Sequence, residues 1–222
     1  MLKVILPATL LALSLQAPVI AAASDEGVAI ATPAKSAKQL ATQQALQLKL
    51  SSVEGFNADF TQRVIDADGN ELQQSNGKLA VKRPNLIHWQ TVAPDETLVV
   101  SDGETLWFYN PFVEQVSAFT VDTAVTNTPI LLLSGLNENA WKDYAVKQIN
   151  EHEFDIQSLN DNAQVKGLHL LFSDNTLIKF TVVDATGQIS HFDLTNVVSK
   201  PLPDMSLFEF TLPEGVDLDD QR

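Results

Sequence analysis

Most of the chain alternates apolar and polar residues with a period of two. In FNADFTQRV (56–64), apolar residues alternate with polar neighbours, as is typical of half-buried strands. Asp102-Gly103 adds a hairpin signal, because such a turn needs positive φ. The expected strands are 56–65, 71–82, 86–91, 97–101, 105–110 and 113–119, followed by YAVKQI (144–149), EFDIQSL (153–159), GLHLLFS (167–173), TLIKFTVVD (176–184), ISHFDL (189–194) and SLFEFTL (206–212).

An amphipathic helix is predicted before the first of these strands. Ser36 followed by Gln39 fits a capping box, in which each side chain satisfies a backbone N–H of the first turn. The helix then covers about 36–52. Its apolar face carries residues at helical spacing, namely Leu46, Leu50 and Val53.

A second helical segment lies in TNTPILLLSGL (126–136). Asn127 or Thr128 can cap it, and Pro129 suits a first helical turn. The following residues are apolar on every side, so this short helix must be covered all round or present a face to a partner.

These elements predict a mainly β fold with some α-helix. We expect one curved antiparallel sheet, an incompletely closed barrel, with a few short helices packed against one side. A sheet that curls without closing leaves a concave apolar face. Helices over that face would form a lid above a hydrophobic cavity.

The first residues predict export. Lys3, an apolar run from Val4 to Leu15 and small residues up to Ala23 match a secretory signal peptide, and the run is too short to span a bilayer comfortably. We expect removal of 1–23, a flexible N-terminal lead at 24–35 and a single domain at 36–222. Without cysteine, no lipid anchor or disulfide can form, so the mature protein is expected to be soluble and unanchored.

Charge narrows the class of partner. The formal net charge is −14, and loss of the signal peptide makes it one unit more negative. Nucleic acid phosphates and an anionic membrane face would both repel such a protein. This negative net charge suits a protein that must diffuse without binding to other surfaces.

The motifs of catalysis and metal binding are missing from the sequence. It has no cysteine nucleophile and no G-x-S-x-G elbow, and its four histidines show no metal-ligand spacing. In EHEF (151–154), the two glutamates would point to one side of a strand and the histidine to the other, so they could not bind one metal ion. The segment DLDD (217–220) lacks the ligand spacing of a calcium-binding loop. We therefore expect no enzyme activity, no catalytic residue, no metal and no cofactor.

The segment 101–116 is rich in aromatic residues. On a strand, Trp107 and Tyr109 share one face, whereas Leu106 and Phe108 share the other. Such a strand is either sandwiched or lines a ligand site, and the sequence leaves open which face points inward. Nearby, Arg83 precedes the apolar stretch 86–89. Judged on its own, it is expected to be an exposed arginine in a surface ion pair.

Several segments, in the same order along the chain, resemble one known family. They are FNADFTQRV (56–64), VKRPNLIHW (81–89), LVVSDGETLWFYNPFVEQV (98–116), NTP (127–129) and GVDLDDQR (215–222). On these segments the chain resembles LolA, the family of periplasmic outer-membrane lipoprotein carriers. Ile87 departs from the pattern, because members commonly carry Phe there.

The resemblance implies a half-closed β-barrel with a helical lid over an apolar cavity. It implies a monomeric periplasmic shuttle that takes lipoproteins from an inner-membrane releasing ABC transporter to an outer-membrane receptor lipoprotein. It also implies that Arg83 holds the lid shut in the empty form, through hydrogen bonds to lid carbonyl groups.

The candidate site residues follow from these expectations. The lid candidates are Leu46, Leu50, Val53, Ile130, Leu131 and Leu133. The cavity-wall candidates are Phe56, Phe60, Trp89, Phe108 and Phe112. The sequence leaves two other functions open. One is a periplasmic lipid- or lipoprotein-sensing domain that regulates a membrane partner, and the other is a periplasmic hydrolase, which the missing nucleophile disfavours.

Overall fold

The computed structural model describes residues 36–222, except 125–128 and 136–137. The predicted signal peptide (1–23) and lead (24–35) lie outside the described residues, as do the predicted caps Asn127 and Thr128. The side chain of Ile130 is also outside the described part, so its predicted place in the lid is not addressed.

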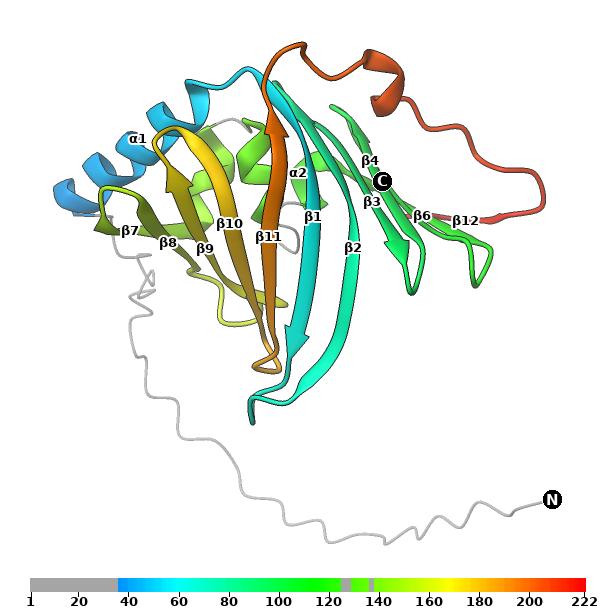
Figure 1. Ribbon diagram of the computed structural model, residues 1–222, viewed down its shortest axis with the longest axis horizontal. Helices are drawn as coiled ribbons and strands as arrows, with labels where there is room; N and C mark the ends of the chain where they lie inside the picture. The colour runs from blue at the N-terminus through cyan, green and yellow to red at the C-terminus, as the bar shows by residue number, and fades with distance from the viewer. Residues whose placement is uncertain (1–35, 125–128, 136–137) are drawn as a thin grey trace, which may run out of the picture. The chain divides into compact units, whose positions relative to one another are not determined.

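One open sheet dominates the fold (Figure 1). Its strand order is β12-β6-β5-β4-β3-β2-β1-β11-β10-β9-β8-β7, and its two ends do not pair, so the expected incompletely closed barrel is confirmed. The strands are β1 (Gly55–Ile65), β2 (Glu71–Lys82), β3 (Leu86–Ala93), β4 (Thr97–Asp102), β5 (Thr105–Asn110), β6 (Gln115–Thr120), β7 (Tyr144–Asn150), β8 (Glu153–Ser158), β9 (Val165–Ser173), β10 (Thr176–Asp184), β11 (Ile189–Val198) and β12 (Asp217–Asp220).

Helix α1 (Ala37–Ser51) begins with the predicted capping box. The Gln39 N–H donates to Ser36 Oγ at 3.3 Å, and the Ser36 N–H donates to Gln39 Oε1 at 2.9 Å. Leu46 and Leu50 are its buried residues, so the predicted apolar face is the one that packs. Figure 1 shows α1 and the short central helices on one side of the sheet.

The remaining helical pieces are short. They are α2 (Val121–Ala124), η1 (Pro129–Ser134), η2 (Glu138–Asp143) and η3 (Met205–Phe208), of which the η segments are 3₁₀ helices. The apolar segment after Pro129 is therefore helical but of the tighter 3₁₀ type. Its Leu131 and Leu132 are fully buried, so this segment is covered on more than one side.

The C-terminal part corrects two predictions. Residues 206–212 do not form the expected strand: Asp204 caps η3 by accepting from the Ser206 N–H, and an extended segment follows. Phe208 packs on Ala80 and Leu86, so the alternating apolar residues cover the outside of the sheet instead of joining a ladder. Residues 217–220, which were not among the expected strands, pair in parallel with β6 as β12, an exception to the expected antiparallel sheet.

Four aromatic rings pack together on the concave side of the sheet. Phe180 and Phe192 stack with centroids 4.4 Å apart, and Trp89 lies 4.9 Å from Phe192 and 5.0 Å from Phe60. These residues come from β10, β11, β3 and β1. Because β2 and β1 separate β3 from β11 in the sheet, the rings can meet only if the sheet curves strongly.

Gly77 on β2 makes room for this packing. It pairs with Phe60 on β1 and with Thr91 on β3, and a Cβ at Gly77 would lie 2.5 Å from Phe60 Cζ and would also collide with the Gln90 carbonyl oxygen. The Phe60 ring therefore occupies the place where another residue would have its side chain.

We predict that Gly77→Ala destabilises the protein, because both colliding groups are fixed by their strands. The free energy of unfolding should fall by roughly 1–3 kcal/mol or more, as for other overpacked sites. Urea denaturation followed by tryptophan fluorescence measures it.

Gly167→Ala on β9 is the matched control, because the nearest atom to its Cβ is a carbonyl oxygen at an ordinary 3.6 Å. Equal stability losses in the two variants would contradict the role assigned to Gly77.

Candidate functional site

The concave side of the sheet holds a cavity of about 860 Å³. Strands β1, β3, β4, β5, β6, β9 and β10 contribute to its wall, together with α2, η1 and the C-terminal Gln221. None of the residues that line it is charged. Its apolar lining consists of Ile87, Trp89, Val99, Leu106, Phe108, Phe119, Ala124, Leu131, Val165, Phe180 and Val182.

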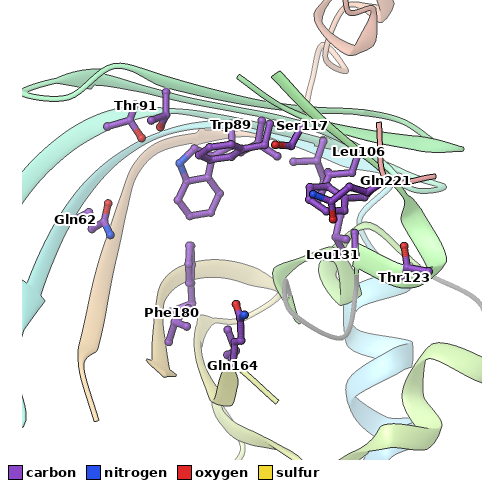
Figure 2. Close-up of a pocket in the computed structure, with 18 residues that line it drawn as sticks. Gln62, Trp89, Thr91, Leu106, Ser117, Thr123, Leu131, Gln164, Phe180 and Gln221 are labelled. Carbon is purple, nitrogen blue, oxygen red and sulfur yellow. The ribbon is translucent and has the colours of Figure 1, made fainter. Parts of the chain in front are cut away.

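The structure settles which face of the aromatic strand β5 points inward. Leu106 and Phe108 line the cavity, whereas Trp107 stacks on Phe210 of the C-terminal segment, with centroids 5.2 Å apart. Phe108 keeps 40% of its surface exposed, because it faces a hollow space instead of packed side chains. Trp89 and Phe180, whose ring centroids lie 5.8 Å apart, both line this space (Figure 2).

The predicted wall and lid residues fall into two groups. Trp89, Phe108 and Leu131 line the cavity, and Phe60 packs behind Trp89. The others lie in the hydrophobic core or pack against it, away from the cavity. These are Leu46, Leu50, Val53, Phe56 and Leu133.

Phe112 corrects the predicted wall. It is 92% exposed and lies in the turn 111–114 that joins β5 to β6. The strand ends at Asn110, whose side-chain oxygen accepts from the Phe112 N–H at 3.0 Å. The alternation that places Leu106 and Phe108 inward therefore does not continue to Phe112.

Strand pairing explains the cavity residues that the sequence did not indicate. Trp89 pairs with Val99, Val99 with Phe108 and Phe108 with Ser117. Residues in such a cross-strand row point to the same face, so one inward residue assigns the whole row. The sequence carries the alternation within each strand but not the register between strands.

Arg83 lies between the sheet and the elements that cover it. Its Nε donates to the carbonyl oxygen of Leu50, in the last turn of α1, at 3.2 Å. A cation suits this position, because the C-terminal end of a helix carries unpaired carbonyl groups and a partial negative charge. Its guanidinium also lies tightly against Gly135, where a Cβ would be 2.9 Å from Arg83 Cζ.

The rest of the turn between β2 and β3 contacts the same covering elements. The Arg83 N–H donates to the Glu54 carbonyl at 2.9 Å, and the Asn85 N–H donates to the Ser134 carbonyl at 3.0 Å. Residues 83–85 thus connect the end of α1 with the end of η1. The turn therefore lies against both covering elements, α1 and η1, and can hold them together.

Arg83 makes no ion pair within the described part of the chain, unlike an arginine in a surface salt bridge. Burial lowers the pKa of its guanidinium from the ordinary value. An arginine nevertheless stays protonated in proteins, so the bond to Leu50 is a charged hydrogen bond.

Comparison with known proteins identifies the family. Residues 51–211 match the family described as "Outer membrane lipoprotein carrier protein LolA". The chain belongs to the LolA family. The match begins at the end of α1 and runs through β1 to β11 and η3, so it includes Arg83 and most of the cavity wall.

Two relatives illustrate the similarity to other members. An "Outer-membrane lipoprotein carrier protein" of Serratia proteamaculans is 43% identical over 180 residues, which is 81% of this chain and 88% of the relative. A protein of the same name from Psychromonas ingrahamii is 40% identical over 181 residues, 81% of this chain and 87% of the relative. A LolA superfamily structure from Nitrosomonas europaea, 14% identical with a TM-score of 0.43, covers 75% of this chain and 97% of its own, a likeness too weak to add to the assignment.

Two further properties of the described residues concern metal binding and membrane crossing. Among the described residues, no cluster of His, Cys, Asp or Glu is arranged to hold a metal ion. Within the same ranges, no helix is long and apolar enough to cross a membrane.

We predict that Gly135→Ala loosens the end of α1. The new Cβ would displace the Arg83 guanidinium, and the bond to Leu50 would be lost. Because charged hydrogen bonds contribute about 1.5–3 kcal/mol, amides of residues 48–55 should exchange with deuterium roughly tenfold faster, as measured by mass spectrometry.

Gly69→Ala is the control for backbone strain. Gly69 has φ +88°, close to the +92° of Gly135, but no atom lies within 4 Å of its Cβ position. If Gly69→Ala accelerated exchange at 48–55 to the same extent, the contact with Arg83 would not be the cause.

Proposed function

We propose that this protein carries acylated lipoproteins through the periplasm, with their acyl groups in the cavity between the sheet and its helical cover. The uncharged cavity of about 860 Å³, in a member of the LolA family, carries this conclusion. The family relatives are named as carriers of outer-membrane lipoproteins. The protein is proposed to bind and release its cargo without chemical change.

The physical problem explains the need for such a cavity. Exposure of an acyl chain to water costs roughly 0.8 kcal/mol per CH₂, or on the order of 12 kcal/mol for a chain of about sixteen carbons. A lipoprotein therefore does not leave a membrane at a useful rate. An apolar cavity lowers this cost by replacing water around the chain.

An empty carrier has the opposite problem, because a large exposed apolar surface promotes aggregation. The proposed answer is that α1 and η1 close over the concave face, with Arg83 as the latch. A charged hydrogen bond of about 1.5–3 kcal/mol is strong enough to favour closure and weak enough for an acyl chain to overcome. Closure also competes with cargo and lowers its apparent affinity, which favours release to an acceptor.

The proposed partners are an inner-membrane ABC transporter that releases lipoproteins and an outer-membrane receptor lipoprotein that accepts them. Delivery between two membranes requires a carrier that does not stay on either. The formal net charge of −14 supports this, because anionic lipid surfaces repel such a protein.

The cargo site can be tested with a lipopeptide whose acyl chain carries bromine, a short-range quencher of tryptophan fluorescence. Trp89 lines the cavity, whereas Trp107 lies on the outside against Phe210. We predict that the lipopeptide quenches wild type and Trp107→Phe but quenches Trp89→Phe much less. Undiminished quenching of Trp89→Phe would place the acyl chain elsewhere.

The latch predicts an effect on cargo transfer. Arg83→Leu should favour the open form, so the protein should retain lipoprotein more tightly and deliver it more slowly. Loss of a charged hydrogen bond of about 1.5–3 kcal/mol corresponds to a decrease in the transfer rate of about tenfold or more, measured with purified receptor lipoprotein. Arg63→Leu, at an exposed arginine of β1, is the control, and transfer by Arg83→Leu at the wild-type rate would refute the latch.

A further inference from the structure

Polar side chains gather at one end of the cavity. Figure 2 shows Gln62 and Thr91 at one end, beyond Trp89, and Leu106 and Leu131 at the other. Thr97, which pairs with Thr91 across β3 and β4, also lines the cavity. This end therefore places polar groups beside an apolar body, as a site for an amphiphilic ligand would. Polar residues also line other parts of the cavity, namely Ser117, Thr123, Gln164 and Gln221.

The amide of Gln62 is held in a defined orientation. Gln62 pairs with Ser75 across β1 and β2, and Ser75 Oγ donates to Gln62 Oε1 at 2.9 Å. Ser75 is only 4% exposed, so its hydroxyl is fixed by its surroundings. With its oxygen engaged, the Gln62 side chain offers its N–H donors, which have no partner among the described residues.

Thr91 supplies a second donor, in the cross-strand row next to that of Gln62 and Ser75. Gly77, its partner on β2, is two positions from Ser75 and on the same face of that strand. Thr91 is 8% exposed and lines the cavity. Its hydroxyl makes no hydrogen bond within the described ranges, so it is a nearly buried polar group available to a ligand.

The absence of charge in the lining determines what these donors can bind. A carboxylate or phosphate taken from water into such a cavity needs a compensating cation, and no lysine, arginine or histidine lines it. An ester or amide carbonyl needs only a hydrogen-bond donor. Gln62 and Thr91 provide donors of this neutral kind.

We infer that Gln62 and Thr91 form a binding site for the ester and amide carbonyl groups that join acyl chains to the head of the cargo. The acyl chains then extend along Trp89 and Phe180 toward Leu106 and Leu131. This inference rests on the proposed carrier function and narrows its substrate class. The site selects neutral acyl esters and amides, as in an acylated cysteine, over free fatty acids.

Other polar residues lie at the opposite end of the cavity, near α2 and near β6, which lies next to the edge strand β12. The Thr123 hydroxyl is already paired with Thr120 Oγ1 at 2.8 Å. Ser117 on β6 lines the same end, but it has no partner like Ser75 to orient a donor beside it. Ser117 therefore offers a matched comparison for the position of the ligand head.

The test compares two synthetic peptides that displace a fluorescent fatty-amine dye from the purified protein. One carries an N-terminal cysteine with two ester-linked chains and one amide-linked palmitoyl chain. The other carries S-hexadecyl cysteine, which has an alkyl chain but no acyl carbonyl. Thr91→Val and Gln62→Leu should each weaken binding of the acylated peptide roughly threefold to tenfold, the effect of one hydrogen bond.

Three controls separate hydrogen bonding from changes in shape. Binding of the S-hexadecyl peptide should change by less than about twofold in both variants, because an alkyl chain accepts no hydrogen bond. Thr91→Ser, which keeps the hydroxyl, should restore binding of the acylated peptide. Gln74→Leu, on the exposed face of β2, should behave as wild type.

The outcomes distinguish this inference from the proposed function. Unchanged binding of the acylated peptide by Thr91→Val and Gln62→Leu, equal losses for both peptides, or a loss confined to Ser117→Ala would each overturn the carbonyl site while leaving the carrier function intact. If wild type bound neither peptide, both proposals would fail. Wild-type binding of palmitate as tight as that of the acylated peptide at pH 8 would also overturn the selectivity.

Discussion

Four aromatic rings packed across the concave face hold the sheet in its curved form. Phe60, Trp89, Phe180 and Phe192 come from strands that are not all neighbours, and their contacts require a strongly curved sheet. Large rings provide this because each buries a wide apolar surface and gains further from edge-to-face geometry. Gly77 gives Phe60 the space it needs, so the packing of the rings also depends on the absence of a side chain at residue 77.

Curvature has a functional consequence because the sheet does not close. The rings fill one part of the concave side, and beyond Trp89 and Phe180 the wall continues around an uncharged cavity of about 860 Å³. The same residues thus serve as core on one side and as ligand surface on the other. A fully packed barrel interior would be more stable but would leave no space for an acyl chain.

The cover is held differently from the sheet. Its contacts with the turn 83–85 include backbone hydrogen bonds and the charged bond from Arg83 to Leu50, which are directional and few. The cover also buries Leu46, Leu50 and Leu131 in the hydrophobic core, and this burial opposes opening in proportion to its area. The hydrogen bonds, in contrast, can be exchanged for water when the cover moves. The outer surface carries the excess of acidic over basic residues, and the cavity carries none of that charge.

Local features of this protein can be predicted from its amino-acid sequence. The capping box at Ser36, the strand alternation and the Asp102-Gly103 turn depend on neighbouring residues, and the structure confirms each of them. The order of the motifs also led to the LolA family, which the comparison confirms. The role of Arg83 stays a prediction, although its contact with Leu50 is of the kind the prediction requires.

The face of each strand that points inward, and the residues that meet there, depend on long-range pairing and could not be predicted from local pattern. Alternation has two equivalent phases, and register between strands selects one. Phe108 points inward because its row contains Trp89 through Val99, and Leu106, two positions earlier on the same strand, shares its face. The prediction that Phe112 lines the wall is wrong because the strand ends at Asn110. The prediction of a strand at 206–212 is wrong because an alternation of apolar residues can pack on the outside of a sheet as well as form part of one. Local pattern fixes secondary structure, whereas the cavity is a product of long-range pairing and curvature.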